Sequence, residues 1–141
     1  MKKFIILGFV CGLTACGGIS EITPDVQYQT ESQLPAIDTG MGQLCIFRVS
    51  NMTGMAVALE MLANDKYIGR LPNSSYFCAN LIPDEYIITG TPTWNEGNNR
   101  ASAETIVRAG TRKYMELQVG MNMGLSTTTR ELGLAGIHSV K

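Results

Sequence analysis

Few side chains in this 141-residue chain are of types that do chemistry on a substrate. The sequence contains one histidine, His138, together with four cysteines and eight methionines. A hydrolytic Ser or Thr needs an adjacent base, and His138, near the end of the sequence, is poorly placed to act as one. The neighbouring carboxylates Asp84 and Glu85 fall in a turn signal, where solvation accounts for them. We therefore expect no catalytic residue and no enzymatic activity.

The most specific motif lies in the first sixteen residues. A short basic start precedes an apolar run over 4–10, which is too short to span a bilayer. Residues 13–16, Leu-Thr-Ala-Cys, resemble the lipobox of bacterial lipoprotein precursors, in which the cysteine thiol receives a diacylglyceryl group before cleavage. The resemblance implies a signal peptide over 1–15 and acyl chains on Cys16 that hold the protein to the bilayer. Gly17 then implies the outer membrane. An ordinary secretory signal with a chance cysteine is the alternative.

Two cysteines remain for chemistry in the mature protein. Cys11 leaves with the signal and Cys16 is acylated, so Cys45 and Cys78 are left, each on a predicted strand. The periplasm is oxidising, and an even pair there favours a disulfide. Closing that loop would stabilise the fold by roughly 3–4 kcal/mol. Two buried free thiols are the alternative, and no Cys-x-x-Cys motif supports a redox-active pair.

Methionines and one tryptophan are the remaining candidates for binding. Met121 and Met123 could bind Cu(I), which soft thioethers favour, with Met52 and Met55 as further ligands. No histidine is near them, so we favour apolar packing and loop filling, and we expect no metal and no cofactor. Trp94 lies in a polar loop, where it could anchor a partner or cap the core.

The net charge argues against a nucleic-acid partner, and the composition separates an N-terminal tether from a folded domain. The formal charge is −1, whereas a nucleic-acid-binding protein needs a basic surface. Residues 17–40 contain two prolines, four acidic residues and no Lys or Arg, with scattered apolar positions. We interpret 16–40 as a lipidated, flexible acidic tether. The alternative is that part of it adds an edge strand to the domain.

From residue 41 onward, short β-type runs alternate with turn signals. They are expected at 43–49, 56–62, 66–71, 75–80, 86–91, 103–108 and 113–119, with an eighth, Thr-rich run at 125–129. Residues 131–140 have helical spacing, which Gly133 and Gly136 weaken. Seven to eight short strands favour an all-β fold over 41–141, an antiparallel sandwich of immunoglobulin or transthyretin type with a short C-terminal helix.

Five short motifs, in this order, resemble a family of bacterial envelope lipoproteins, the domain-of-unknown-function family 2846. They are Phe47-Arg48, Tyr67 to Leu71, Ser75-Tyr76-Phe77, Leu81 to Tyr86, and Val107 to Gly110 ahead of Tyr114. Asp84 stands where the family usually has glycine. The resemblance implies a β-sandwich lipoprotein, and it supplies no activity and no catalytic residue.

These observations lead to an expected function of binding. We expect an outer-membrane lipoprotein whose periplasmic domain is an accessory component of an envelope assembly, such as a secretion or pilus-type machine. The expected partners are the lipid bilayer, through Cys16, and an unidentified envelope protein that docks on a strand edge or loop. A periplasmic inhibitor or ligand-binding lipoprotein is the alternative.

Overall fold

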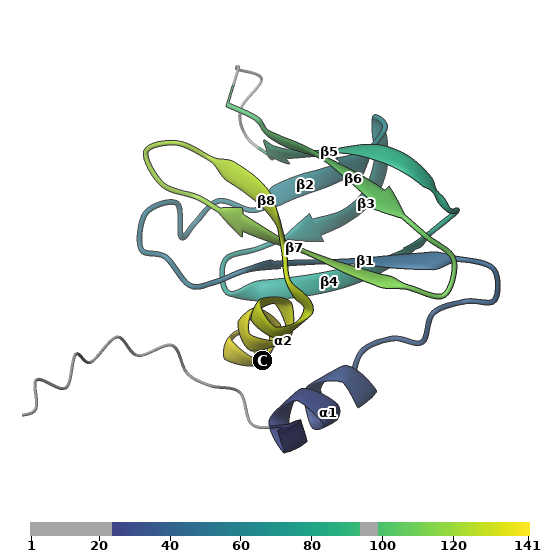
Figure 1. The fold of residues 1–141 in the computed structure, drawn as a ribbon. Coiled ribbons are helices and arrows are strands. Elements are labelled where there is room, and N and C mark those ends of the chain that lie inside the picture. Colours follow the sequence, from purple (N-terminus) through teal and green to yellow (C-terminus); the bar gives the residue numbers. More distant parts are fainter. Residues whose placement is uncertain (1–23, 94–98) are drawn as a thin grey trace, which may run out of the picture.

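The computed structural model describes residues 24–93 and 99–141, and it shows three layers (Figure 1). Two four-stranded sheets pack face to face, and helices lie against the outer side of one of them. The elements are α1 (Pro24–Ser32), β1 (Gly42–Arg48), β2 (Leu59–Ala63), β3 (Lys66–Leu71), β4 (Ser75–Leu81), β5 (Asp84–Pro92), β6 (Ala101–Val107), β7 (Arg112–Gln118), β8 (Gly124–Thr128) and α2 (Arg130–Ser139). None of the described helices is long and apolar enough to cross a membrane.

The strand order confirms the expected sandwich and adds one parallel pair. Sheet A has the order β4-β1-β7-β8, and sheet B has the order β3-β2-β5-β6. Within sheet A, β1 and β7 are parallel, whereas all other pairs are antiparallel. The two strands start together because the turns before them are joined, with Gly110 N donating to Met41 O at 2.9 Å. Parallel and antiparallel strands show the same alternation, so the pattern of residues did not reveal this pair.

The turn signal between the expected runs at 56–62 and 66–71 corresponds to a hairpin, and the last two expected elements are present. Asn64 and Asp65 form a two-residue loop between β2 and β3, and both have positive φ, 47° and 65°. Such a loop matches the twist of the strands it joins. The Thr-rich run forms β8, and the C-terminal helix is present as α2, which Thr129 caps by accepting a hydrogen bond from Leu132 N.

The centre of sheet A, around β1, is buried on both faces, and the main core lies on one of them. Side chains of both sheets form that core, including Leu44, Ile46, Met61, Ile88 and Leu117. A second apolar cluster lies on the other face, between sheet A and the helical layer. It consists of Leu34, Cys45, Phe47, Tyr114, Leu134 and Ile137. As a result, every residue of β1 is buried.

Helix α2 lies directly on aromatic rings of sheet A, and its glycines permit this approach. A Cβ at Gly136 would lie 2.0 Å from Phe47 Cε2, and one at Gly133 would lie 2.4 Å from Tyr114 Cγ. No side chain fits at either position while the rings keep their places. The two glycines therefore mark the face of α2 that contacts the sheet, although each lowers the intrinsic helix propensity.

The expected flexible tether over 16–40 is wrong for residues 24–40. Residues 24–32 form α1, which contacts α2, and the side chains of Thr30 and Leu34 are buried. The ordered unit thus begins at least as early as Pro24, ahead of the predicted boundary at residue 41. Polar contacts make much of the attachment of this segment to the domain, and few apolar residues contribute to it. Its composition consequently resembles that of a linker. Cys16 and the rest of 1–23 lie outside the described residues.

Replacing Gly136 with alanine tests the contact between α2 and sheet A. We expect Gly136→Ala to lower the free energy of unfolding by about 1–3 kcal/mol, because the methyl group overpacks against Phe47. In an exposed helix the same change would stabilise by about 1 kcal/mol. Urea unfolding of the full chain measures the difference. Gly124→Ala is the control, since nothing lies within 4 Å of a Cβ there. A Gly136→Ala variant as stable as the parent would contradict this packing.

Candidate binding site

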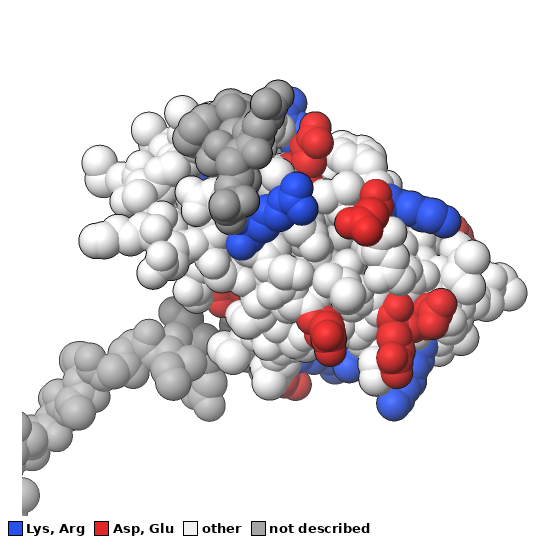
Figure 2. Space-filling view, turned by 90° about the horizontal axis from the view of Figure 1, so that it is seen from above, with Lys and Arg blue, Asp and Glu red and all other residues white. Residues whose placement is uncertain are grey.

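Among the described residues, no helix covers the outer face of sheet B, in contrast to sheet A. Figure 1 shows α1 and α2 on the far side of sheet A, and Figure 2 looks at the molecule from above the view of Figure 1. Alternation along β5 and β6 turns Ile88 and Val107 into the core and leaves Ile87 and Ile106 outside. These two isoleucines are 52% and 46% exposed. The described part of the chain therefore leaves this face open to a partner.

A groove of about 670 Å³ crosses the β5–β6 part of this face and continues to sheet A. Its lining is Asn64, Glu85, Tyr86, Ile87, Glu104, Thr105, Ile106, Arg108, Lys113 and Thr127. Ile87 lies opposite Glu104 across the strand pair, and Ile106 lies opposite Glu85, so apolar and acidic side chains alternate diagonally. The volume falls within the usual range for ligand sites.

The hydrogen bonds of Asn64 hold one side of the groove against the start of β5. Its side chain accepts from Ile87 N at 2.8 Å and donates to Glu85 O at 3.2 Å, which continues the sheet past the end of β2. Tyr86 donates its hydroxyl to Ile82 O at 2.8 Å, and burial together with the charge of Asp84 raises the pKa of Tyr86. The tyrosine is therefore neutral at physiological pH.

The charges in the groove have both signs. Glu85 and Glu104 lie on β5 and β6, whereas Arg108 and Lys113 lie in the β6–β7 turn and on β7. Side chains of this kind can pair with either sign of charge on a ligand, and the two isoleucines offer apolar contact. Such a lining suits a polypeptide segment better than a small anion or cation.

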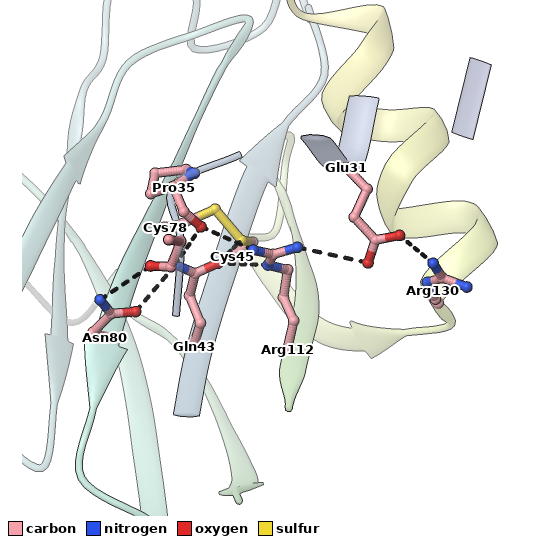
Figure 3. A network of polar contacts seen from close by, with 9 residues as sticks. Glu31, Pro35, Gln43, Cys45, Cys78, Asn80, Arg112 and Arg130 are labelled. Atoms are coloured by element: carbon pink, nitrogen blue, oxygen red, sulfur yellow. Dashed lines mark hydrogen bonds and ion pairs between the residues drawn. A yellow bond between two sulfur atoms is a disulfide. The ribbon is translucent and has the colours of Figure 1, made fainter. Parts of the chain in front are cut away.

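Gln43, which is fully buried in β1, attaches the N-terminal segment to the sandwich (Figure 3). Its amide Nε2 lies 3.1 Å from Pro35 O, 3.3 Å from Ala36 O and 3.0 Å from Asn80 Oδ1. Its Oε1 accepts a hydrogen bond from Arg112 Nε. A buried amide left unpaired would cost about 1–3 kcal/mol, so these contacts couple the segment to the core.

Arg112 and Glu31 extend this network to both helices. Arg112 Nη2 donates to Pro35 O at 2.8 Å, and Arg112 Nη1 lies 3.6 Å from Glu31 Oε1. The other oxygen of Glu31 pairs with Arg130 at the start of α2, and this contact raises the pKa of Arg130. One carboxylate on α1 thus joins two arginines that are eighteen residues apart in sequence.

Arg48, at the other end of β1, holds the loop over residues 49–58. Its guanidinium donates to Val57 O and, at 2.7 Å, to Gly54 O, while its Nε has no partner among the described residues. Burial lowers the pKa of Arg48. Gly54 has a φ of 76°, which favours glycine, so the carbonyl that Arg48 binds depends on that residue. The arginine of the Phe47-Arg48 motif therefore has a structural role, because it holds the loop that follows β1.

The expected disulfide is present, whereas the other two predicted site residues lie outside the described part of the chain. Cys45 and Cys78 are direct partners in the β1–β4 register and are bonded. Trp94 and Cys16 lie outside the described residues. His138 is on α2, with Nδ1 3.5 Å from Thr30 Oγ1, and it does not line the groove. The sequence carried a weak signal for the groove, because Ile87 and Ile106 sit out of phase with the buried positions of their strands.

Comparison with known proteins adds little to these observations. No family model matches the chain, and no curated protein matches it in sequence. Among solved structures it resembles an NMR structure of a protein from Eubacterium rectale, with 11% sequence identity and a TM-score of 0.41. That match covers 67% of this chain and 96% of the other, and a similarity this low indicates nothing about function. The resemblance to the domain-of-unknown-function family therefore rests on its short motifs.

Replacing Gln43 with leucine tests the attachment of the N-terminal segment. We expect Gln43→Leu to speed hydrogen exchange across 24–40, because the carbonyls of Pro35 and Ala36 lose their buried donor. Mass spectrometry of the full chain measures exchange segment by segment. Gln118→Leu, an exposed position at the end of β7, is the matched control and should leave 24–40 unchanged. Equal exchange in both variants would show that Gln43 does not hold the segment.

Proposed function

We propose that this chain is an outer-membrane lipoprotein whose sandwich binds another envelope protein, as an accessory component of an envelope assembly. The protein acts by binding and does not catalyse a reaction. The observation that carries the proposal is the uncovered face of sheet B, with Ile87 and Ile106 exposed beside a groove. Exposed apolar side chains grouped in a groove are typical of interaction sites.

The position of α1 supports an orientation in which the outer face of sheet B points away from the lipid anchor. The segment that would link Cys16 to the domain enters α1, and α1 lies on the side of sheet A away from sheet B (Figure 1). Only seven residues, 17–23, separate Cys16 from the start of the helix. An extended chain spans at most about 3.6 Å per residue, so the anchor would stay within about 30 Å of α1. Sheet B would be left free to meet a partner.

A partner that presents an extended segment would fit the groove and the neighbouring sheet edge best. β6 is an edge strand of sheet B, and β6 also contributes Glu104, Thr105 and Ile106 to the groove. A segment laid along this edge would place apolar side chains against Ile106, with Ile87 on the next strand inward. Its charged residues would meet the glutamates on one side and Arg108 and Lys113 on the other. Strand addition of this kind draws much of its affinity from backbone hydrogen bonds.

Charge inserted into the groove should prevent partner binding. We expect Ile87→Asp/Ile106→Asp to lower the yield of the cross-linked envelope partner at least about tenfold, because each carboxylate would be desolvated in the interface. Quantitative mass spectrometry after cross-linking in intact cells measures the yield. The control is Leu132→Asp, which adds a charge at an exposed apolar position of α2. An unchanged yield in the groove variant would exclude this face, and capture of one small periplasmic enzyme would favour an inhibitor.

Lipidation is tested independently of the groove. We expect an alkyne-tagged fatty acid to label the parent protein, and Cys16→Ser to abolish the label and release the protein from the membrane fraction. Cys11→Ser is the matched control, because that residue would leave with the signal peptide, and it should be labelled normally. Labelling that persists in Cys16→Ser would show that the anchor lies elsewhere.

A further inference from the structure

Strand β6 forms an edge of sheet B, and the groove runs beside the second half of this strand. In the sheet order β6 comes last, so among the described strands only β5 pairs with it. The groove is lined by Thr105 and Ile106 of β6 together with Lys113 and Thr127 of sheet A, so it opens between this half of β6 and the other sheet. A strand edge of this kind can pair with another strand through its backbone groups.

The backbone groups of Glu104 and Ile106 point toward this open edge. Ile87 on β5 uses its N–H and its carbonyl to bond Asn64, on the β2 side of the sheet. Backbone groups alternate in direction along an antiparallel ladder, so the Ile87–Glu104 pair exchanges no backbone hydrogen bonds. The N–H and C=O of Glu104, and those of Ile106 two residues further on, consequently face away from β5.

The exposed side chains along this edge form a self-complementary row. Glu104, Ile106 and Arg108, which directly follows β6, are exposed, whereas the residues between them are buried. Neither Glu104 nor Arg108 has an ion-pair partner among the described residues. They cannot pair with each other, because four residues of extended strand separate them by about 13 Å. Each charge is therefore available to a strand that pairs with this edge.

We propose that a second copy of this chain pairs its β6 antiparallel with β6, in a register centred on Ile106. This register places Ile106 opposite Ile106, and it places Glu104 of each copy opposite Arg108 of the other. Centring the pair on Glu104 would oppose two like charges, and centring it on Thr105 would place Glu104 opposite an isoleucine. The two sheets B would then form one continuous sheet about a two-fold axis, which closes the assembly at two copies.

The proposed dimer uses the same sheet edge as the proposed function, and it does not depend on lipidation. A second copy and an envelope partner would compete for the backbone groups of Glu104 and Ile106. The dimer is therefore the form that we expect when no partner is present.

Charge reversal tests this pairing in the full chain, purified in nonionic detergent, by sedimentation velocity over a concentration series. We expect Glu104→Arg and Arg108→Glu each to weaken the dimer at least about tenfold, because each change sets like charges opposite each other at both ends of the strand pair. The double variant Glu104→Arg/Arg108→Glu should dimerise like the parent, since the opposite charges have exchanged places. Lys66→Glu, on the other edge strand of sheet B, is the matched control and should leave dimerisation unchanged.

Mixing the two single variants gives an independent readout of the register. One variant carries two positive charges along the edge and the other carries two negative charges, so together they should form a heterodimer about as tightly as the parent forms its homodimer. An affinity tag on one variant identifies that species. A parent that stays monomeric at every concentration, or single variants that dimerise like the parent, would overturn the inference. A monomeric chain that is still cross-linked to its envelope partner in cells would overturn this inference alone and leave the proposed function standing.

Discussion

Burial of β1 on both faces is the constraint on which the rest of the structure depends. The strand contacts the core between the sheets on one side and the helical layer on the other, so its polar side chains cannot reach bulk water. Gln43 and Arg48, at its two ends, must therefore find partners within the protein. Gln43 binds the carbonyls of the segment before β1, and Arg48 binds those of the loop after it. One buried strand thus organises both ends of the sandwich.

The helical layer makes the two outer faces of the sandwich unequal. Gly133 and Gly136 let α2 lie on Tyr114 and Phe47, and α1 is joined to α2 and to sheet A through Glu31 and Arg112. The second apolar cluster is filled in this way, whereas sheet B keeps an open face. A lipid anchor before α1 would leave that open face available. This asymmetry links the attachment of the N-terminal segment to the proposed binding role.

The groove lies apart from the loops over 49–58 and 119–123, which carry the exposed Met52, Met55 and Met121. The groove includes the turn after β2, the turn after β6 and the start of β7, whereas the loops follow β1 and β7. The buried Arg48 holds the first loop, and Asn51 joins it to the second. The methionine side chains at 52, 55 and 121 are exposed on this loop pair.

Short-range patterns determined most of the elements, the turn at Asn64-Asp65, the C-terminal helix and the pairing of Cys45 with Cys78. These features depend on alternation, on turn chemistry or on an even count of cysteines, all of which are local or compositional. Only the tertiary structure decided the parallel pairing of β1 with β7, the docking of 24–40 and the exposure of the loop methionines. Gln43 and Arg48 look like surface residues in the sequence, because nothing local shows that a second layer covers their strand. The physical reason is that burial and hydrogen-bond partners depend on segments far apart in the chain, which no periodicity within one segment records.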